Sequence, residues 1–207
     1  MILTRTPART LLALAAFGLA AAAIYSLASR DAPHPYLASG VALPQPRTLP
    51  EFQLVDQHAR PFGRASLRGG WTLVFAGFTH CPDICPATLA TLAAVDAQLD
   101  GSGVELATVF LSLDPERDQP ATLAPYLAHF SPEFIGVTGA PEEISRLVAG
   151  LGLAYIRVPT GAESYTIDHS AALVLIDPQA RVAAYFKPPL AAEAIATDLV
   201  ALAGPQR

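Results

Sequence analysis

Two cysteines, Cys81 and Cys85, are the only thiols in this chain of 207 residues, and three residues separate them. Cysteines so close together cannot join distant segments, so a disulfide scaffold explains them poorly. As thiolates, they would bind soft metal ions or attack disulfides. The pair therefore predicts one functional spot, either a metal site or a redox-active dithiol.

The pair falls between an apolar strand expected at residues 71–78 and a helix expected at 86–99. Pro86 suits the first helical position, because its missing N–H would have been unpaired there. Since a residue before proline avoids helical dihedrals, we expect Cys85 in the loop at the mouth of the helix. Unpaired backbone N–H groups and the helix dipole would there favour thiolate over thiol.

Two thiolates with one imidazole suit copper(I), which accepts three ligands, whereas zinc normally takes four. Among the five histidines, His169 precedes a strand expected at 171–176, and its position could bring it to the sheet end that carries Cys81. His80, beside the thiols, is the alternative third ligand. The remaining histidines are expected in a tether or at the surface: His34, His58 and His129.

Apolar strands alternate with periodic helices through most of the chain, which predicts an α/β fold with a mixed sheet and helices on both faces. Strands are expected at residues 52–55, 61–67, 71–78, 104–113, 134–137, 155–158, 171–176 and 182–186. Helices are expected at residues 86–99, 121–129, 141–151 and 191–202.

The N-terminus carries an uncharged apolar run at residues 11–27, preceded by Arg5 and Arg9. The run is nearly long enough to span a bilayer, and the basic flank predicts that the rest of the chain is exported. We expect residues 1–30 to be one transmembrane anchor, because the run is longer than the apolar region of most signal peptides. A cleaved signal segment and a soluble buried helix are the alternatives.

Residues 31–50 contain five prolines and little periodicity, so they are expected to form an extended tether before a globular domain at 51–207. The formal net charge of −5 argues against nucleic acid as the main partner.

Four segments, in order, resemble the SCO/SenC family of copper chaperones for cytochrome c oxidase assembly, within roughly residues 52–186. A spaced cysteine pair alone is weak evidence, but all four segments after an N-terminal anchor are specific. They read FTHCPDICP at 78–86, SLDPERDQP at 112–120, FIGVTG at 134–139, and DHS at 168–170 followed by LIDP at 175–178.

This resemblance implies a thioredoxin-like fold in which Cys81, Cys85 and His169 hold copper, which favours His169 over His80. It also implies delivery of copper to the binuclear centre of cytochrome c oxidase subunit II, or reduction of that centre's cysteines before loading. A copper donor protein and a thiol reductant would be further partners. The expected location is an inner membrane, crossed once, with the C-terminal domain on the periplasmic or equivalent side.

Two other functions compete with copper transfer. Cys81 and Cys85 could be the redox pair of a thiol–disulfide reductase, although thioredoxins have two intervening residues rather than three. The chain could instead be a copper- or redox-responsive signalling module. Three acidic residues have open roles: Asp114 as a tuning or turn carboxylate, Asp83 as loop structure, and Asp168 as a group that orients the histidine loop.

Overall fold

The computed structural model describes residues 37–162 and 164–203. None of the helices in that part of the chain combines the length and the apolar character that a membrane crossing requires. The anchor expected at residues 1–30 lies outside the described residues.

An eight-stranded sheet forms the centre of the molecule, in the order β1-β10-β9-β4-β5-β6-β2-β3. The three strands β4, β5 and β6 are parallel, because a helix connects each to the next, and the other neighbours are antiparallel. The bounds are β1 Gly40–Thr48, β2 Gln53–Asp56, β3 Pro61–Gly63, β4 Trp71–Gly77, β5 Leu106–Ser112, β6 Ile135–Thr138, β9 Leu173–Ile176 and β10 Arg181–Phe186.

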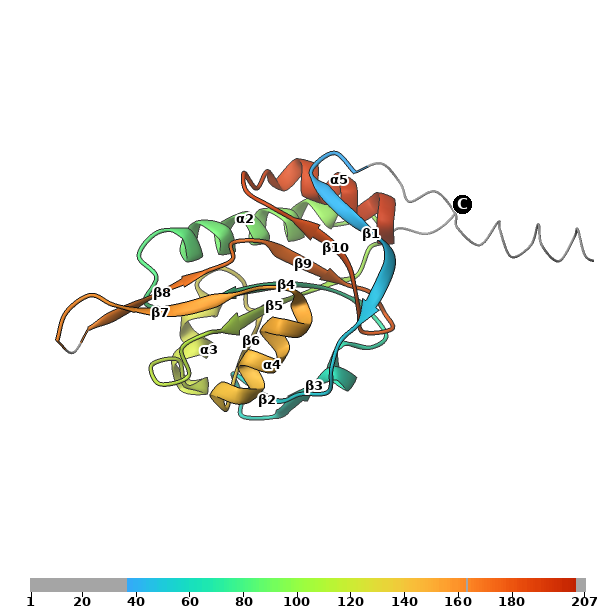
Figure 1. Ribbon diagram of the computed structural model, residues 1–207. Helices are drawn as coiled ribbons and strands as arrows, with labels where there is room; N and C mark the ends of the chain where they lie inside the picture. Colours follow the sequence, from blue (N-terminus) through green and yellow to red (C-terminus); the bar gives the residue numbers. More distant parts are fainter. Residues whose placement is uncertain (1–36, 163, 204–207) are drawn as a thin grey trace, which may run out of the picture. The chain divides into compact units, whose positions relative to one another are not determined.

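Helices cover both faces of this sheet, so its central strands read as continuous apolar runs. Helices α2 and α5 lie side by side on one face, and α4 lies against the other, where the Tyr185 hydroxyl donates to the Leu151 carbonyl at 2.7 Å (Figure 1). The predicted mixed sheet with helices on both faces is therefore confirmed. The helix bounds are α2 Ile84–Leu99, α3 Pro120–Ala128, α4 Pro141–Leu151 and α5 Ala192–Ala203, with a short 3-10 helix, η1, at Arg64–Leu67.

The expected tether is wrong for residues 40–48, which form the edge strand β1 paired with β10. The pairing shifts register between Ala42 and Arg47, the stretch that contains Pro44 and Pro46. An edge strand tolerates proline because it needs hydrogen bonds on one side only. The prolines of residues 40–48 therefore led to the prediction of a tether where the chain forms a strand.

The start of β1 is fixed to the last helix by one carboxylate. Asp198 of α5 is buried and accepts hydrogen bonds from the backbone N–H groups of Ala38, Ser39 and Gly40 at 2.7–2.9 Å. The Ser39 hydroxyl adds a fourth bond at 2.8 Å. This carboxylate satisfies the donors of the segment that leads into β1.

A second, two-stranded sheet was not predicted. It pairs β7 (Tyr155–Pro159) with β8 (Tyr165–His169) as an antiparallel hairpin. His169 is the last residue of β8, rather than a loop residue directly before the next strand. Within the described residues, the hairpin shares no strand pairing with the large sheet.

Candidate metal centre

The two cysteines follow β4 at the carboxyl end of the central strands. Cys81 is partly exposed in the loop after Phe78, and Cys85 is fully buried in the first turn of α2. The prediction that Cys85 lies in the loop is wrong, because α2 begins at Ile84 and Pro86 is its third residue. A proline is tolerated there, since the N–H groups of the first turn have no intrahelical partner.

Gly77, the last residue of β4, allows the Cys85 sulfur to approach the sheet. A Cβ at this position would lie 2.8 Å from Cys85 Sγ and 3.0 Å from a ring carbon of Phe110. Both distances are shorter than an ordinary van der Waals contact. The position of the sulfur therefore depends on the absence of a side chain at residue 77.

His169 joins the cysteines from the hairpin. One ligand atom from each of Cys81, Cys85 and His169 lies within 4.8 Å of the other two, although the histidine comes 84 positions after Cys85 in the sequence. The Nε2 atom of His169 is 3.6 Å from Cys85 Sγ. Its Nδ1 atom lies 3.1 Å from the Ser170 carbonyl oxygen, which can only accept, so Nδ1 carries the proton. Nε2 is therefore the acceptor atom of the ring, and it faces Cys85 Sγ.

Aromatic rings hold the imidazole in a partly buried position. The rings of Phe75 and Phe78 each pack edge-on against His169, with centroid separations of 6.1 Å. Burial lowers the pKa of His169, against the opposing effect of its bond to Ser170. The neutral ring, the form that binds metals, is therefore favoured.

The two thiols differ in their surroundings. Burial raises the pKa of the Cys85 thiol, so the expected stabilisation of its thiolate by the helix mouth is outweighed in the metal-free protein. The Cys85 backbone N–H instead donates to Cys81 Sγ at 3.4 Å. The helix start thus presents a donor to the partly exposed sulfur of Cys81, while burial favours the protonated form of Cys85.

Within the described residues, the other histidines and the acidic residues near the thiols lie outside this group; His34 is not among the described residues. His80 is exposed and contacts the Thr79 hydroxyl at 3.1 Å, so it is adjacent in sequence but not a member of the group. Asp168, expected to orient the histidine, is exposed, and the Ser170 carbonyl performs that task. Asp83 is exposed as well, and the surface positions predicted for His58 and His129 are confirmed.

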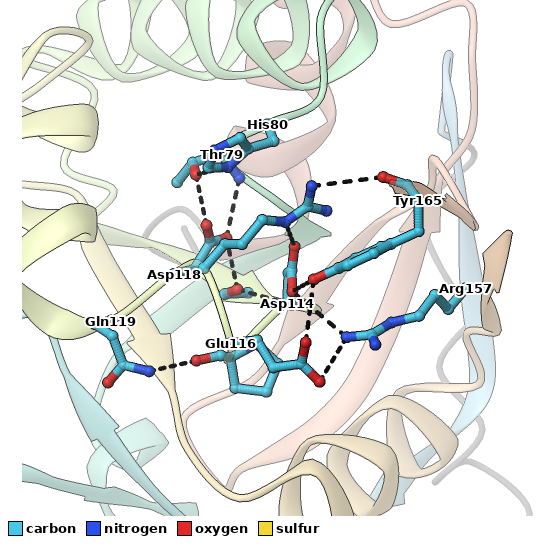
Figure 2. A network of polar contacts seen from close by, with 11 residues as sticks. Thr79, His80, Asp114, Glu116, Asp118, Gln119, Arg157 and Tyr165 are labelled. Carbon is cyan, nitrogen blue, oxygen red and sulfur yellow. Dashed lines mark hydrogen bonds and ion pairs between the residues drawn. The ribbon is translucent and has the colours of Figure 1, made fainter. Parts of the chain in front are cut away.

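The loop after β5 carries two fully buried carboxylates, Asp114 and Asp118. The sequence analysis left the role of Asp114 open and did not single out Asp118. Asp118 accepts from the Thr79 N–H at 3.0 Å, from the Thr79 hydroxyl at 2.5 Å and from the Ser112 hydroxyl at 2.7 Å (Figure 2). It therefore holds the loop that leads to the cysteines. Asp114 contacts the hairpin instead, through the Tyr165 hydroxyl at 2.8 Å. The motif SLDPERDQP was the signal for both.

The sheet, the helices and the position of the cysteines at the start of α2 define a thioredoxin-like protein. Comparison with known families then places the chain more narrowly. The family model SCO1/SenC matches residues 41–204, and the chain belongs to this family.

Two relatives from other organisms are similar to this chain over much of this domain. The mitochondrial protein SCO1 homolog 1 of Arabidopsis thaliana is 39% identical over 129 residues, which cover 62% of this chain and 39% of that protein. The SCO2-like protein of Rickettsia felis is 34% identical over 168 residues, 79% of this chain and 82% of that protein.

Solved structures show the same fold. ScoI of Bradyrhizobium japonicum with copper bound has a TM-score of 0.67 and 37% identity, covering 73% of this chain and 97% of that chain. ScoI of Arabidopsis thaliana with copper bound has a TM-score of 0.69 and 34% identity, covering 73% of this chain and 94% of that chain.

Proposed function

We propose that this protein binds one copper(I) ion through Cys81, Cys85 and His169. The observation that carries the proposal is the convergence of these three side chains, with their ligand atoms within 4.8 Å of one another. Two sulfurs and one imidazole nitrogen are a donor set that copper(I) accepts, whereas a structural zinc site asks for four ligands. Structures of two relatives with copper bound support the same choice of metal.

The two thiols differ in exposure, and this difference suits a protein that transfers copper rather than one that stores it. A closed structural site would bury all its ligands, but Cys81 is partly exposed and an incoming protein ligand can reach the metal from its side. Exchange would begin at Cys81, while the buried Cys85 and the hairpin-borne His169 hold the ion until the acceptor has attached.

The acceptor that we propose is the binuclear copper centre of cytochrome c oxidase subunit II, as the family resemblance implies. A copper donor protein would load the site. Residues 1–30 would anchor the protein in an inner membrane, with the domain on the periplasmic or equivalent side. These assignments rest on family membership and on the apolar run at residues 11–27.

Anaerobic titration of the full chain with copper(I), against a competing chelator, tests the ligand set. We expect one tightly bound ion in the wild type, and affinity lower by at least about tenfold in Cys81→Ser, Cys85→Ser and His169→Ala. His58→Ala is the control, because His58 is exposed on the turn between β2 and β3. Full affinity in Cys85→Ser or His169→Ala would exclude the three-ligand site.

A thiol–disulfide reductase is the second candidate, favoured by two unbonded thiols whose sulfurs lie within 4.8 Å. The Cys81 thiolate would attack a partner's disulfide, forming a mixed disulfide and releasing one partner thiolate. Cys85 would then attack Cys81 Sγ, which releases the second partner thiolate and leaves a Cys81–Cys85 disulfide for a thiol reductant to restore. Rescue of oxidase assembly by His169→Ala would favour this function, because dithiol exchange needs no imidazole.

A further inference from the structure

We propose that Tyr165, held between Arg117 and Arg157, positions His169 for copper binding; this inference rests on the copper site proposed above. Tyr165 and His169 are the first and last residues of strand β8. Because the hairpin forms its own two-stranded sheet, strand pairing does not fix its position relative to the sheet that carries the cysteines. Short connections join its base to α4 and to β9, and side-chain contacts must fix the end that carries Tyr165.

The Tyr165 ring is enclosed by two guanidinium groups. The central carbons of Arg117 and Arg157 each lie 3.9 Å from its centroid. Two guanidinium groups at this height cannot share one face of a ring, so one covers each face. Both contacts are attractive, because the ring face carries negative charge density. The hairpin thus supplies a tyrosine and one arginine, and the loop after β5 supplies the other arginine.

Carboxylates of that same loop complete the attachment (Figure 2). The Tyr165 hydroxyl donates to Asp114 at 2.8 Å, and Arg157 pairs with Glu116 at 2.8 Å. Asp114 is fully buried, and its second oxygen accepts from Arg117 Nε. Two positive and two negative side chains balance one another around the ring. The hairpin is therefore attached to a loop of the main sheet at its Tyr165 end.

The attachment extends to the histidine through Phe78. The Arg117 guanidinium lies 5.8 Å from the Phe78 ring centroid, and Phe78 packs edge-on against His169. The side chains Tyr165, Arg117, Phe78 and His169 thus form one run of contacts, with its two ends on the same strand. Without the attachment at Tyr165, the hairpin can pivot and His169 Nε2 leaves its position 3.6 Å from Cys85 Sγ.

Copper(I) titration of the full chain, by chelator competition, tests this role in Tyr165→Leu and Arg157→Gln. We expect Tyr165→Leu to weaken binding on the order of tenfold, as loss of groups that orient metal ligands does. Arg157→Gln removes a half-exposed pair and should weaken binding roughly threefold. Arg146→Gln is the matched control, since Arg146 is 50% exposed against 48% for Arg157 and also pairs with a glutamate. It should bind as the wild type does.

Addition of Tyr165→Leu to His169→Ala separates positioning from general destabilisation. If Tyr165 acts through His169, the double variant binds copper(I) no more weakly than His169→Ala alone. Tyr165→Leu should also lose the imidazole nitrogen hyperfine splitting in the copper(II) spectrum. An equal loss of affinity in both backgrounds, or a retained splitting, would overturn the proposal.

A readout without metal separates this inference from the proposed function. In the metal-free chain, Tyr165→Leu should shift and broaden the His169 ring resonances in the NMR spectrum, while Arg146→Gln leaves them unchanged. Tyr165→Phe, which keeps the stacked ring, should have an intermediate effect. Unchanged His169 resonances in Tyr165→Leu would refute the positioning role, whether or not the wild type binds copper.

Discussion

Gly77→Ala tests how tightly the fold holds the Cys85 sulfur. The new Cβ would lie 2.8 Å from Cys85 Sγ, whereas ordinary contacts begin near 3.4 Å. If the sulfur alone moves, it must shift by about 0.6 Å, a large displacement for a metal ligand. The Phe110 ring, 3.0 Å away, blocks an alternative adjustment. Added atoms in a packed core cost about 1–3 kcal/mol of unfolding free energy.

For a chain of this size, that cost lowers the melting temperature by roughly 2–12 °C. Thermal unfolding of the metal-free protein, followed by circular dichroism, measures it, and chelator competition should show copper(I) affinity reduced by about tenfold. Gly70→Ala is the matched control, because a Cβ there meets nothing within 4 Å. Gly77→Ala with wild-type melting temperature and affinity would show that the contact at the sulfur does not constrain the site.

Three further predictions concern neighbouring parts of the fold. Asp198→Ala should lower the unfolding free energy at pH 7 by about 2–4 kcal/mol in urea titrations, because four donors lose their acceptor. Burial alone would raise the pKa of Asp198, but those hydrogen bonds outweigh it and hold the pKa below the ordinary 3.8. The wild type's advantage over Asp198→Ala is therefore complete well above pH 3.8 and shrinks as pH falls below it; an advantage that persists undiminished at the lowest accessible pH would contradict this. Asp118→Asn exchanges one acceptor oxygen for a donor that faces other donors, and calorimetry should show a loss of about 1–3 kcal/mol; no loss would mean that the loop does not need this carboxylate. His80→Ala should bind copper(I) within about twofold of the wild type in chelator competition, since an exposed side chain outside the ligand group contributes little, and a tenfold loss would make His80 a ligand.

Local patterns were sufficient to predict the central elements. The apolar run before the cysteines forms β4, and the periodic leucines after them form α2, because burial on both faces or on one face imposes these patterns directly. The spacing of Cys81 and Cys85 alone was enough to predict that they belong to one site. His169 was one of two candidates until the family resemblance favoured it, since its approach to Cys85 bridges 84 residues.

The remaining features depend on partners distant in sequence. β1 is a strand because it forms backbone hydrogen bonds with β10, about 140 residues later in the chain. No local sequence pattern indicates such a distant partner. Cys85 was placed in the loop because residues before proline avoid helical dihedrals, but this is only an average preference. The first helical turn tolerates a proline, because its N–H groups have no partner within the helix. The enclosure of Tyr165 joins three separate segments, so no local pattern in the sequence indicated it.

Two optical signals, tryptophan emission and absorption by bound copper, would arise near opposite ends of strand β4. It begins at Trp71, the only tryptophan in the chain, and ends at Gly77 beside the Cys85 sulfur. Six steps along an extended chain separate these ends by about 20 Å. Tryptophan emission therefore reports on the integrity of the sheet, while thiolate-to-copper absorption would report on the site. A single sample, without any attached dye, can thus reveal whether a variant loses its metal by unfolding or with its sheet intact.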